Sequence, residues 1–416
     1  MDISLRQVAT ALIFVFTTAL FVLFILFDTY TWGKYAFIGL SICIFMLGCG
    51  INNGKIGIRF TQYTTFNVLF IGFTLLSSLW AISASDSVVM ARTLMRIFIC
   101  AYMVYITYLN TPELDEMVFL KSVMWAGYIV SLYSLSFYGL DRMIVAGSSN
   151  LRISNEFANV NTIGLACALS CVIQINFKCL SSKKHFSPSA LLMIPSVVVI
   201  AATQSRKALV FLIVGVLGYA FIKAQKSPKS IFIKGFKIMF WILILSFVFY
   251  WILQLGIFEG IRERMEGMLN AGFGNGQVDH STIVRNNLKT LGIEWFLRYP
   301  FGGIGIANPH ILANYYYAFD AYLHDNFVEL LCGGGIIGFS VYYSMYVYLF
   351  IQLWKYRKAD PQRVTFFAMW LGLMFAMDYG MVSYYGKSNN FYLMIHFFYV
   401  FQLKQKAVLE LSLIHI

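Results

Sequence analysis

The sequence predicts an all-α, polytopic integral membrane protein that forms a single transmembrane domain over residues 1–416. Composition is the first reason. Hydrophobic residues make up 59% of the chain and charged residues only 12%, whereas soluble domains carry about 25% charged residues. The second reason is that apolar runs long enough to cross a bilayer recur along the chain. The third is that long polar sequence is confined to one insertion, residues 257–326.

Taken in order, the apolar runs predict about twelve membrane spans. No small-residue cleavage site follows the first run, so we expect it to be retained as a span and not removed as a signal peptide. The seventh run is short. The expected spans cover residues 8–27, 35–51, 63–82, 93–109, 117–138, 158–177, 190–202, 208–224, 238–257, 327–353, 364–382 and 391–403.

The basic residues in the short connections predict the orientation of these spans, because cytoplasmic loops carry an excess of Lys and Arg. More than half of the 31 Lys and Arg residues fall on one side if both termini are cytoplasmic. The richest connections on that side are residues 178–184, 223–237 and 355–363. The insertion between spans nine and ten is then external. Topology also explains most of the net charge of +12, so no nucleic-acid partner is expected.

The seven cysteines lie in or beside apolar runs, and none is paired with another in a loop. This placement is typical of small buried hydrophobic residues and indicates neither a disulfide framework nor a metal site. The middles of the spans are almost free of charge. A flippase or permease would need a polar path through the membrane, so the pattern favours an enzyme at the outer surface over a carrier.

The insertion at residues 257–326 is expected to form half of an active site, since long loops without a function are uncommon. Its first part, residues 257–269, alternates charged and apolar positions as an amphipathic interfacial helix would. Residues 272–276 predict a flexible break. Ser281 is a candidate N-cap for a second helix, which carries Arg285 and ends before Pro300 and the following glycines.

Two shorter external segments carry candidate anion ligands. Arg152 precedes a helix whose first turn includes Asn161, and a guanidinium beside a helix start suits an anion. The alternative is a capped helix start with an arginine among lipid headgroups. Ser205 and Arg206 lie in a tight turn between two spans, where Arg206 is either an anion ligand or an ordinary snorkelling arginine.

The end of the insertion carries an aromatic cluster, residues 315–322, and then His324 at the mouth of the tenth span. Aromatic rings such as Tyr316 could stack on sugars, although an interfacial aromatic belt is an equally good explanation. A lone histidine at a helix start is usually structural. A neutral imidazole is also suited to general-base catalysis near pH 7. His310 is the competing candidate for that role, and His280 is a weaker one.

Three motifs occur in a fixed order on the predicted external side. They are Arg152…Asn161, the Thr203-Gln-Ser-Arg206 turn, and Pro300-Phe-Gly-Gly-Ile-Gly305 followed by His324-Asp-Asn and Gly335-Ile-Ile-Gly338. This ordered set resembles the O-antigen ligase and polymerase superfamily of bacterial envelope glycan enzymes over roughly residues 152–338. Three departures stand out: Asp325 where the family usually has asparagine, Val160 where it commonly has proline, and an extra glycine in Gly302-Gly303-Ile-Gly305.

The resemblance implies a GT-C-like, metal-independent glycosyltransferase without a cofactor, in the bacterial inner membrane with its active site on the periplasmic side. The donor would be an undecaprenyl-diphosphate-linked glycan and the acceptor a sugar hydroxyl, with membrane lipids and a chain-length regulator as further partners. It implies that His324 is the catalytic base and that Arg206, Arg285 and Arg152 bind the diphosphate. Further substrate contacts are expected from Asn161, Ser205, Tyr316, Asp325 and Glu329, and Asp325 or Glu329 could orient the His324 ring.

Two activities of that superfamily remain open. A polymerase extends a lipid-linked chain by a repeat unit of O-antigen or capsule, whereas a ligase moves a finished chain onto lipid A core or a protein. The Ser-Arg-Lys-Ala turn and the His-Asp-Asn-Phe-Val-Glu segment look more like those of polymerases. A polymerase is therefore the preferred prediction.

Overall fold

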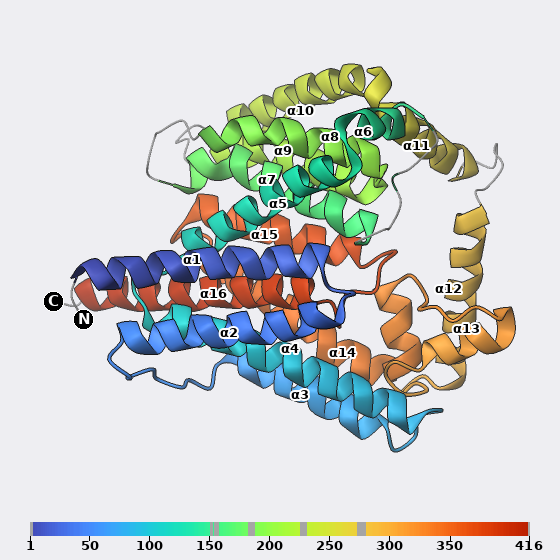
Figure 1. The fold of residues 1–416 in the computed structure, drawn as a ribbon, viewed down its shortest axis with the longest axis horizontal. Coiled ribbons are helices and arrows are strands. Elements are labelled where there is room, and N and C mark those ends of the chain that lie inside the picture. The colour runs from blue at the N-terminus through green and yellow to red at the C-terminus, as the bar shows by residue number, and fades with distance from the viewer. Residues whose placement is uncertain are drawn as a thin grey trace. The chain divides into compact units, whose positions relative to one another are not determined.

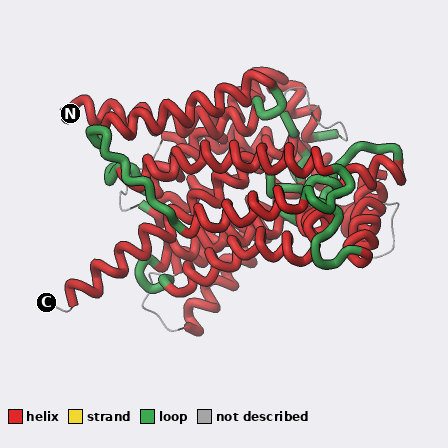
Figure 2. Tube along the Cα trace, turned by 90° about the horizontal axis from the view of Figure 1, so that it is seen from below, coloured by secondary structure: helices red, strands yellow, loops and turns green. Residues whose placement is uncertain are grey.

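A computed structural model describes residues 3–149, 153, 158–181, 188–224, 231–272 and 280–414. In this part of the chain the regular structure is entirely helical, and Figure 2 shows helices joined by loops with no strand among them. The predicted all-α class is therefore confirmed.

Each predicted span falls on a helix. These helices are α1 (Ile3–Leu26), α2 (Thr31–Ile51), α3 (Gln62–Ser77), α4 (Ala84–Asn110), α5 (Glu116–Tyr138), α7 (Val160–Leu180), α8 (Met193–Thr203), α9 (Arg206–Ala224), α10 (Ile231–Leu253), α14 (Asn326–Lys355), α15 (Pro361–Met377) and α16 (Lys387–Ile414). Among the described residues, six helices are long and apolar enough to cross a membrane, namely α1, α2, α4, α5, α7 and α14. A seventh span arises if the segments Met239–Leu253 and Gly256–Gly267, bent by 92°, are counted as one.

Helix length explains part of the difference between six spans and about twelve. Helices α3, α8 and α15 contain only 16, 11 and 17 residues. At about 1.5 Å per residue they fall short of a hydrocarbon core of about 30 Å. The structure supports a polytopic membrane protein, and the larger number of spans stays a prediction.

The chain divides into two compact units. The first contains residues 1–55, 108–277 and 356–370, and the second contains residues 56–107, 278–355 and 371–416. Asn161, Ser205 and Arg206 belong to the first unit. Arg285 and His324 belong to the second.

Helix α7 is the centre of the first unit, where α5, α8 and α9 pack against it (Figure 1). Small residues allow this close approach. A Cβ atom on Gly127 of α5 would lie 2.5 Å from the Ala166 carbonyl oxygen of α7, and one on Gly164 would lie 2.8 Å from the Thr203 hydroxyl at the end of α8. The Thr203–Arg206 turn is thereby held against the start of α7.

The long insertion folds into η2 (Gly256–Phe258), α11 (Glu259–Gly272), α12 (His280–Arg298) and α13 (Pro309–Tyr317). The predicted amphipathic helix corresponds to α11, and α12 ends before Pro300 as predicted. The predicted N-cap at Ser281 is wrong, because α12 already begins at His280. The predicted break at residues 272–276 lies almost wholly outside the described residues. Helix α13 was not predicted.

Candidate active site

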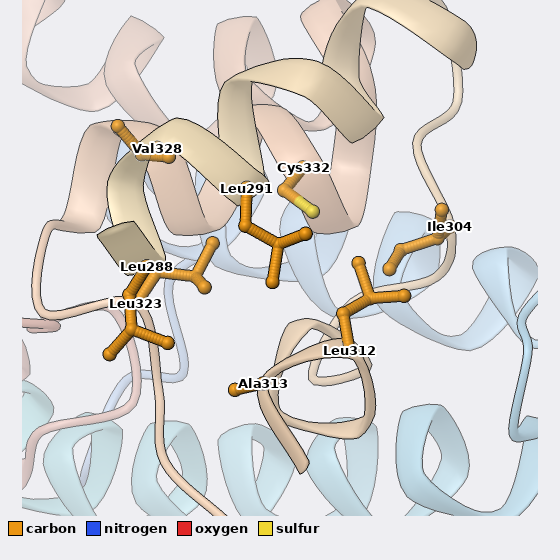
Figure 3. Packing of buried hydrophobic residues seen from close by; sticks show 8 residues of the cluster. All are labelled: Leu288, Leu291, Ile304, Leu312, Ala313, Leu323, Val328 and Cys332. Atoms are coloured by element: carbon orange, nitrogen blue, oxygen red, sulfur yellow. The ribbon is translucent and has the colours of Figure 1, made fainter. Parts of the chain in front are cut away.

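A small hydrophobic cluster fixes the geometry of the candidate site in the second unit. Buried side chains from α12, α13, α14 and the loops between them converge in it, as Figure 3 shows; they are Leu288, Leu291, Ile304, Leu312, Ala313, Leu323, Val328 and Cys332. Gly292 brings the helices still closer, since a Cβ atom there would lie 2.5 Å from Leu323 and 2.6 Å from Val328. Helix α12 is thus packed directly onto the start of α14.

This packing places Arg285 and His324 on one cavity of about 530 Å³. The cavity is also lined by Tyr317, Phe319 and neighbouring residues of α12. Arg285 is half-buried and projects from the second turn of α12. The sequence predicted both polar residues separately, and the structure brings them together. Tyr317 and Phe319 come from the predicted aromatic cluster, whereas Tyr316 is 48% exposed and does not line this cavity.

The turn that carries His324 is held by its neighbours. The His324 backbone adopts a left-handed conformation with φ of +58°, which is uncommon for a residue other than glycine. Its ring lies 4.4 Å from the ring of Tyr322, centroid to centroid. Burial raises the pKa of the Tyr322 phenol, and the nearby Arg285 guanidinium opposes that rise. A neutral phenol and a guanidinium therefore flank the imidazole.

Asp325 and Glu329 hold this turn onto the start of α14. Asp325 Oδ1 accepts hydrogen bonds from the backbone N–H groups of Phe327 at 3.0 Å and Val328 at 3.2 Å. Its Oδ2 pairs with Lys289 Nζ of α12 at 2.8 Å. Glu329 Oε2 accepts a hydrogen bond from Leu323 N at 2.8 Å. These contacts give both carboxylates a structural role at the turn. Orientation of the His324 ring by either carboxylate, and direct contact of either with a substrate, stay predictions.

Asn326 ties the same turn to the connection between α15 and α16. Its Nδ2 donates to Tyr343 Oη at 2.9 Å and to Asp378 Oδ2 at 3.2 Å, and its Oδ1 accepts from Ser383 N at 2.9 Å and Tyr384 N at 3.1 Å. Tyr343 and Ser383 also donate to the Asp378 carboxylate. Apart from the asparagine of His324-Asp-Asn, no local pattern indicates this network, because its members lie 17 to 58 residues away from Asn326 along the chain.

The glycine motifs form reciprocal backbone hydrogen bonds between the loop after α12 and the middle of α14. Helix α14 is interrupted at Gly335, where φ is +60° and ψ is −167°. Ile304 N and Gly305 N donate to the carbonyls of Cys332 and Gly333, at 3.0 and 2.8 Å, while Ile336 N donates to the Pro300 carbonyl at 2.8 Å. The loop therefore satisfies backbone groups that the helix break leaves open.

The loop is also fixed on its other side. Asn308 Nδ2 donates to Ser87 Oγ at 3.0 Å, and Ser83 N donates to Asn308 Oδ1 at 2.6 Å. His310, the competing candidate base, has Nδ1 at 2.8 Å from the Ala307 carbonyl and Nε2 at 3.7 Å from Asp86. These contacts place His310 in the scaffold of the loop, away from the residues that line the Arg285 cavity.

The Arg206 turn belongs to the first unit. Gln204 ends α8 in a left-handed conformation, and its Nε2 donates to the carbonyls of Ala146 at 2.8 Å and Ser149 at 2.7 Å. Arg264 of α11 donates to the Gln204 carbonyl at 3.3 Å. Arg206 is half-buried, and its guanidinium lies 3.5 Å from the Arg264 carbonyl. Arg264 of α11 thus contacts both sides of the turn, through its side chain and through its backbone carbonyl.

Two further predicted contacts lie on helix starts in this unit. Ser205 is buried, and its Oγ lies 3.4 Å from Ala208 N in the first turn of α9, as an N-cap would. Asn161 lies in the first turn of α7, where its backbone N–H donates to Asn159 Oδ1 at 2.9 Å. Both have local structural explanations, and their contact with a substrate stays a prediction. Arg152 lies outside the described residues.

The fold and the cavity together define a multi-helix membrane protein with an arginine and a histidine beside an aromatic wall. Residues 190–343 of this chain match the family described as O-Antigen ligase. The match contains Arg206, Arg285 and His324 and leaves the Arg152 element outside. The resemblance inferred from the motifs is therefore confirmed over these residues. No curated protein matches the chain.

Proposed function

We propose that the chain is a polysaccharide polymerase. It transfers an undecaprenyl-diphosphate-linked glycan to a sugar hydroxyl at the outer face of the bacterial inner membrane. The observation that carries the proposal is the cavity shared by Arg285 and His324. The family match over residues 190–343 supports this class of reaction, because both residues lie inside it.

The proposed chemistry assigns one task to each polar residue. The acceptor hydroxyl oxygen attacks the anomeric carbon of the donor glycan, and the bond from that carbon to the diphosphate oxygen breaks. The bonding electrons leave with the lipid diphosphate, whose growing negative charge Arg285 stabilises with charge-assisted hydrogen bonds. His324 accepts the proton of the attacking hydroxyl.

The cavity suits a sugar beside a diphosphate. Its volume of about 530 Å³ lies within the usual range for ligand pockets, about 300–1,000 Å³. Tyr317 and Phe319 provide aromatic surface in the same cavity as the polar residues. Aromatic rings offer an apolar face, and tyrosine adds a polar tip. We assign these two rings to the sugar in place of Tyr316.

The remaining parts of the proposal rest on the sequence. Arg206 is a second diphosphate ligand on the first unit, and Arg152 is a third. The protein has about twelve spans, a GT-C-like arrangement, cytoplasmic termini and a metal-independent reaction, and it works with a chain-length regulator. Reporter fusions test the topology: position 358 should read cytoplasmic and position 147 external.

A ligase is the second candidate, because the matched family carries that description. Liposomes containing the purified protein and one lipid-linked repeat unit separate the two activities. A polymerase produces a ladder of lipid-linked oligomers from the repeat unit alone. A ligase leaves the repeat unit unchanged until lipid A core or a protein acceptor is added.

The same assay tests the role of Arg285. Arg285→Ala should abolish transfer, and Arg285→Lys should restore little of it, since an ammonium cannot reproduce the planar donor fork. Arg298→Ala is the matched control, because Arg298 lies on the same helix, is exposed and stacks 5.1 Å from the Trp295 ring. Full transfer by Arg285→Ala would refute the assignment.

A further inference from the structure

Two arginines lie on the exposed face of α4, one helical turn apart. Helix α4 is one of the candidate membrane spans, and Arg92 and Arg96 occupy positions i and i+4 on it. Arg92 is exposed, and Arg96 is half-buried. At about 1.5 Å per residue they lie about 12 and 18 Å from the start of the helix. Both therefore lie in the N-terminal half of this candidate span and not in a connecting loop.

The surface around the pair is apolar. Val89, Met95 and Ile99 share this face and are 55%, 47% and 49% exposed. Charged side chains in such a position are costly, and two like charges at positions i and i+4 also repel each other. Snorkelling to the headgroup level accounts for Arg92. It gives no partner to Arg96, whose Nε is buried without a hydrogen-bond partner among the described residues.

The start of α4 contacts the loop between α12 and α13 in the unit that carries the candidate site. Just before and within the first turn of α4, Ile82 N donates to the Ile304 carbonyl at 3.0 Å and Ser87 Oγ donates to the Ile306 carbonyl at 2.8 Å. Ile304 also belongs to the hydrophobic cluster that positions Arg285 and His324. A lipid bound at the arginine pair would therefore have its headgroup on the same half of the second unit as the cavity.

We propose that Arg92 and Arg96 form a docking site for the diphosphate of a polyisoprenyl-diphosphate lipid that arrives laterally from the membrane. Two guanidinium groups on adjacent turns match two linked phosphoryl groups, whereas an ordinary phospholipid offers one phosphate. The apolar side chains around the pair receive the lipid tail. The site rests on the proposed function for its biological meaning, and it is separate from the Arg285 cavity.

Binding of undecaprenyl diphosphate itself tests this site without relying on transfer. The full chain is placed in phosphatidylcholine nanodiscs, and bound undecaprenyl diphosphate is measured by native mass spectrometry. The double variant Arg92→Gln/Arg96→Gln should bind at least about tenfold more weakly, which corresponds to about 1.4 kcal/mol. Arg92→Gln alone changes an exposed side chain, so it gives a folded variant and should show part of the loss.

Lys34→Gln/Arg142→Gln is the matched control, because it removes two exposed positive charges from the first unit. It should change the affinity by less than about twofold, as exposed charges usually contribute little. Unchanged affinity in the arginine double variant would overturn the site, as would an equal loss of phosphatidylglycerol binding. Inactive protein that still binds the lipid through Arg92 and Arg96 would count against the proposed function and leave this site standing.

Discussion

The ion pair between Lys289 and Asp325 should fix the turn that carries His324, and a double-mutant cycle can measure how strongly. The pair is short, 2.8 Å, and the two side chains are only 16% and 2% exposed. Lys289 Nζ also lies 3.6 Å from the ring centroid of Tyr379. The family usually has asparagine in place of Asp325, which makes Asp325→Asn a natural perturbation.

The expected magnitudes follow from what each variant leaves buried. Asp325→Asn keeps a side-chain oxygen for the two backbone amides and loses only the ion pair, so it should cost about 2 kcal/mol. Lys289→Met leaves a buried carboxylate without its cation and should cost about 3 kcal/mol. The double variant contains no unpaired charge and should cost about 2 kcal/mol, which gives a coupling energy of about 3 kcal/mol.

Cys332 provides a local probe for this cycle, since it is fully buried in the cluster beside the turn. In a background without the other cysteines, the rate at which a thiol reagent modifies Cys332 reports local opening of the second unit. Asp325→Asn should accelerate modification about 30-fold. Additive effects of the two single variants would refute the view that this ion pair holds the turn.

Three further predictions concern the scaffold and the second diphosphate ligand. Gly335→Ala should destabilise the second unit by about 3 kcal/mol, because φ is +60° and the new Cβ would meet the Phe301 carbonyl. Gly72→Ala is the matched control, since nothing lies within 4 Å of a Cβ atom at that position. The rate of Cys332 modification compares the two variants. Asp378→Asn weakens the side chain that accepts hydrogen bonds from the Tyr343 and Ser383 hydroxyl groups, so kcat should fall more than about fivefold with little change in KM. An unchanged kcat would contradict the view that Asp378 positions the turn of His324 through Asn326. Arg206→Lys should lose most transfer activity in the liposome assay, because a point charge replaces the planar fork; full activity would mean that only interfacial charge matters there.

The sequence predicted the helices well, because a long run of apolar residues is a local feature that can be recognised without knowing the fold. Each apolar run became a helix, and Pro300 with its glycines ended α12 where expected. The N-cap at Ser281 was wrong, because α12 already includes His280. Helix α13 was missed because its Tyr-rich sequence resembles an interfacial belt as much as a helix. Short helices such as α3 and α8 show why apolar runs do not convert directly into spans.

The individual residues of the candidate site could be predicted from the sequence, but their arrangement in space could not. Arg285 and His324 were identified separately, and only the packing of α12 on α14 brings them to one cavity. The role of Lys289 depends on a contact with Asp325 that no local pattern encodes. Asn326 looked like part of a catalytic motif, whereas the structure uses it as the centre of a polar network.

The most direct test of the account is a comparison of two histidine variants in one transfer assay. His324→Ala should lose about a hundred- to ten-thousand-fold in transfer rate, the usual contribution of a general base, while it still binds undecaprenyl diphosphate. His310→Ala should keep most activity, since His310 contacts the Ala307 carbonyl and Asp86 in the scaffold. A His324→Ala enzyme that works at the wild-type rate would contradict the central claim, and one that has lost donor binding would make His324 a diphosphate ligand and not the base.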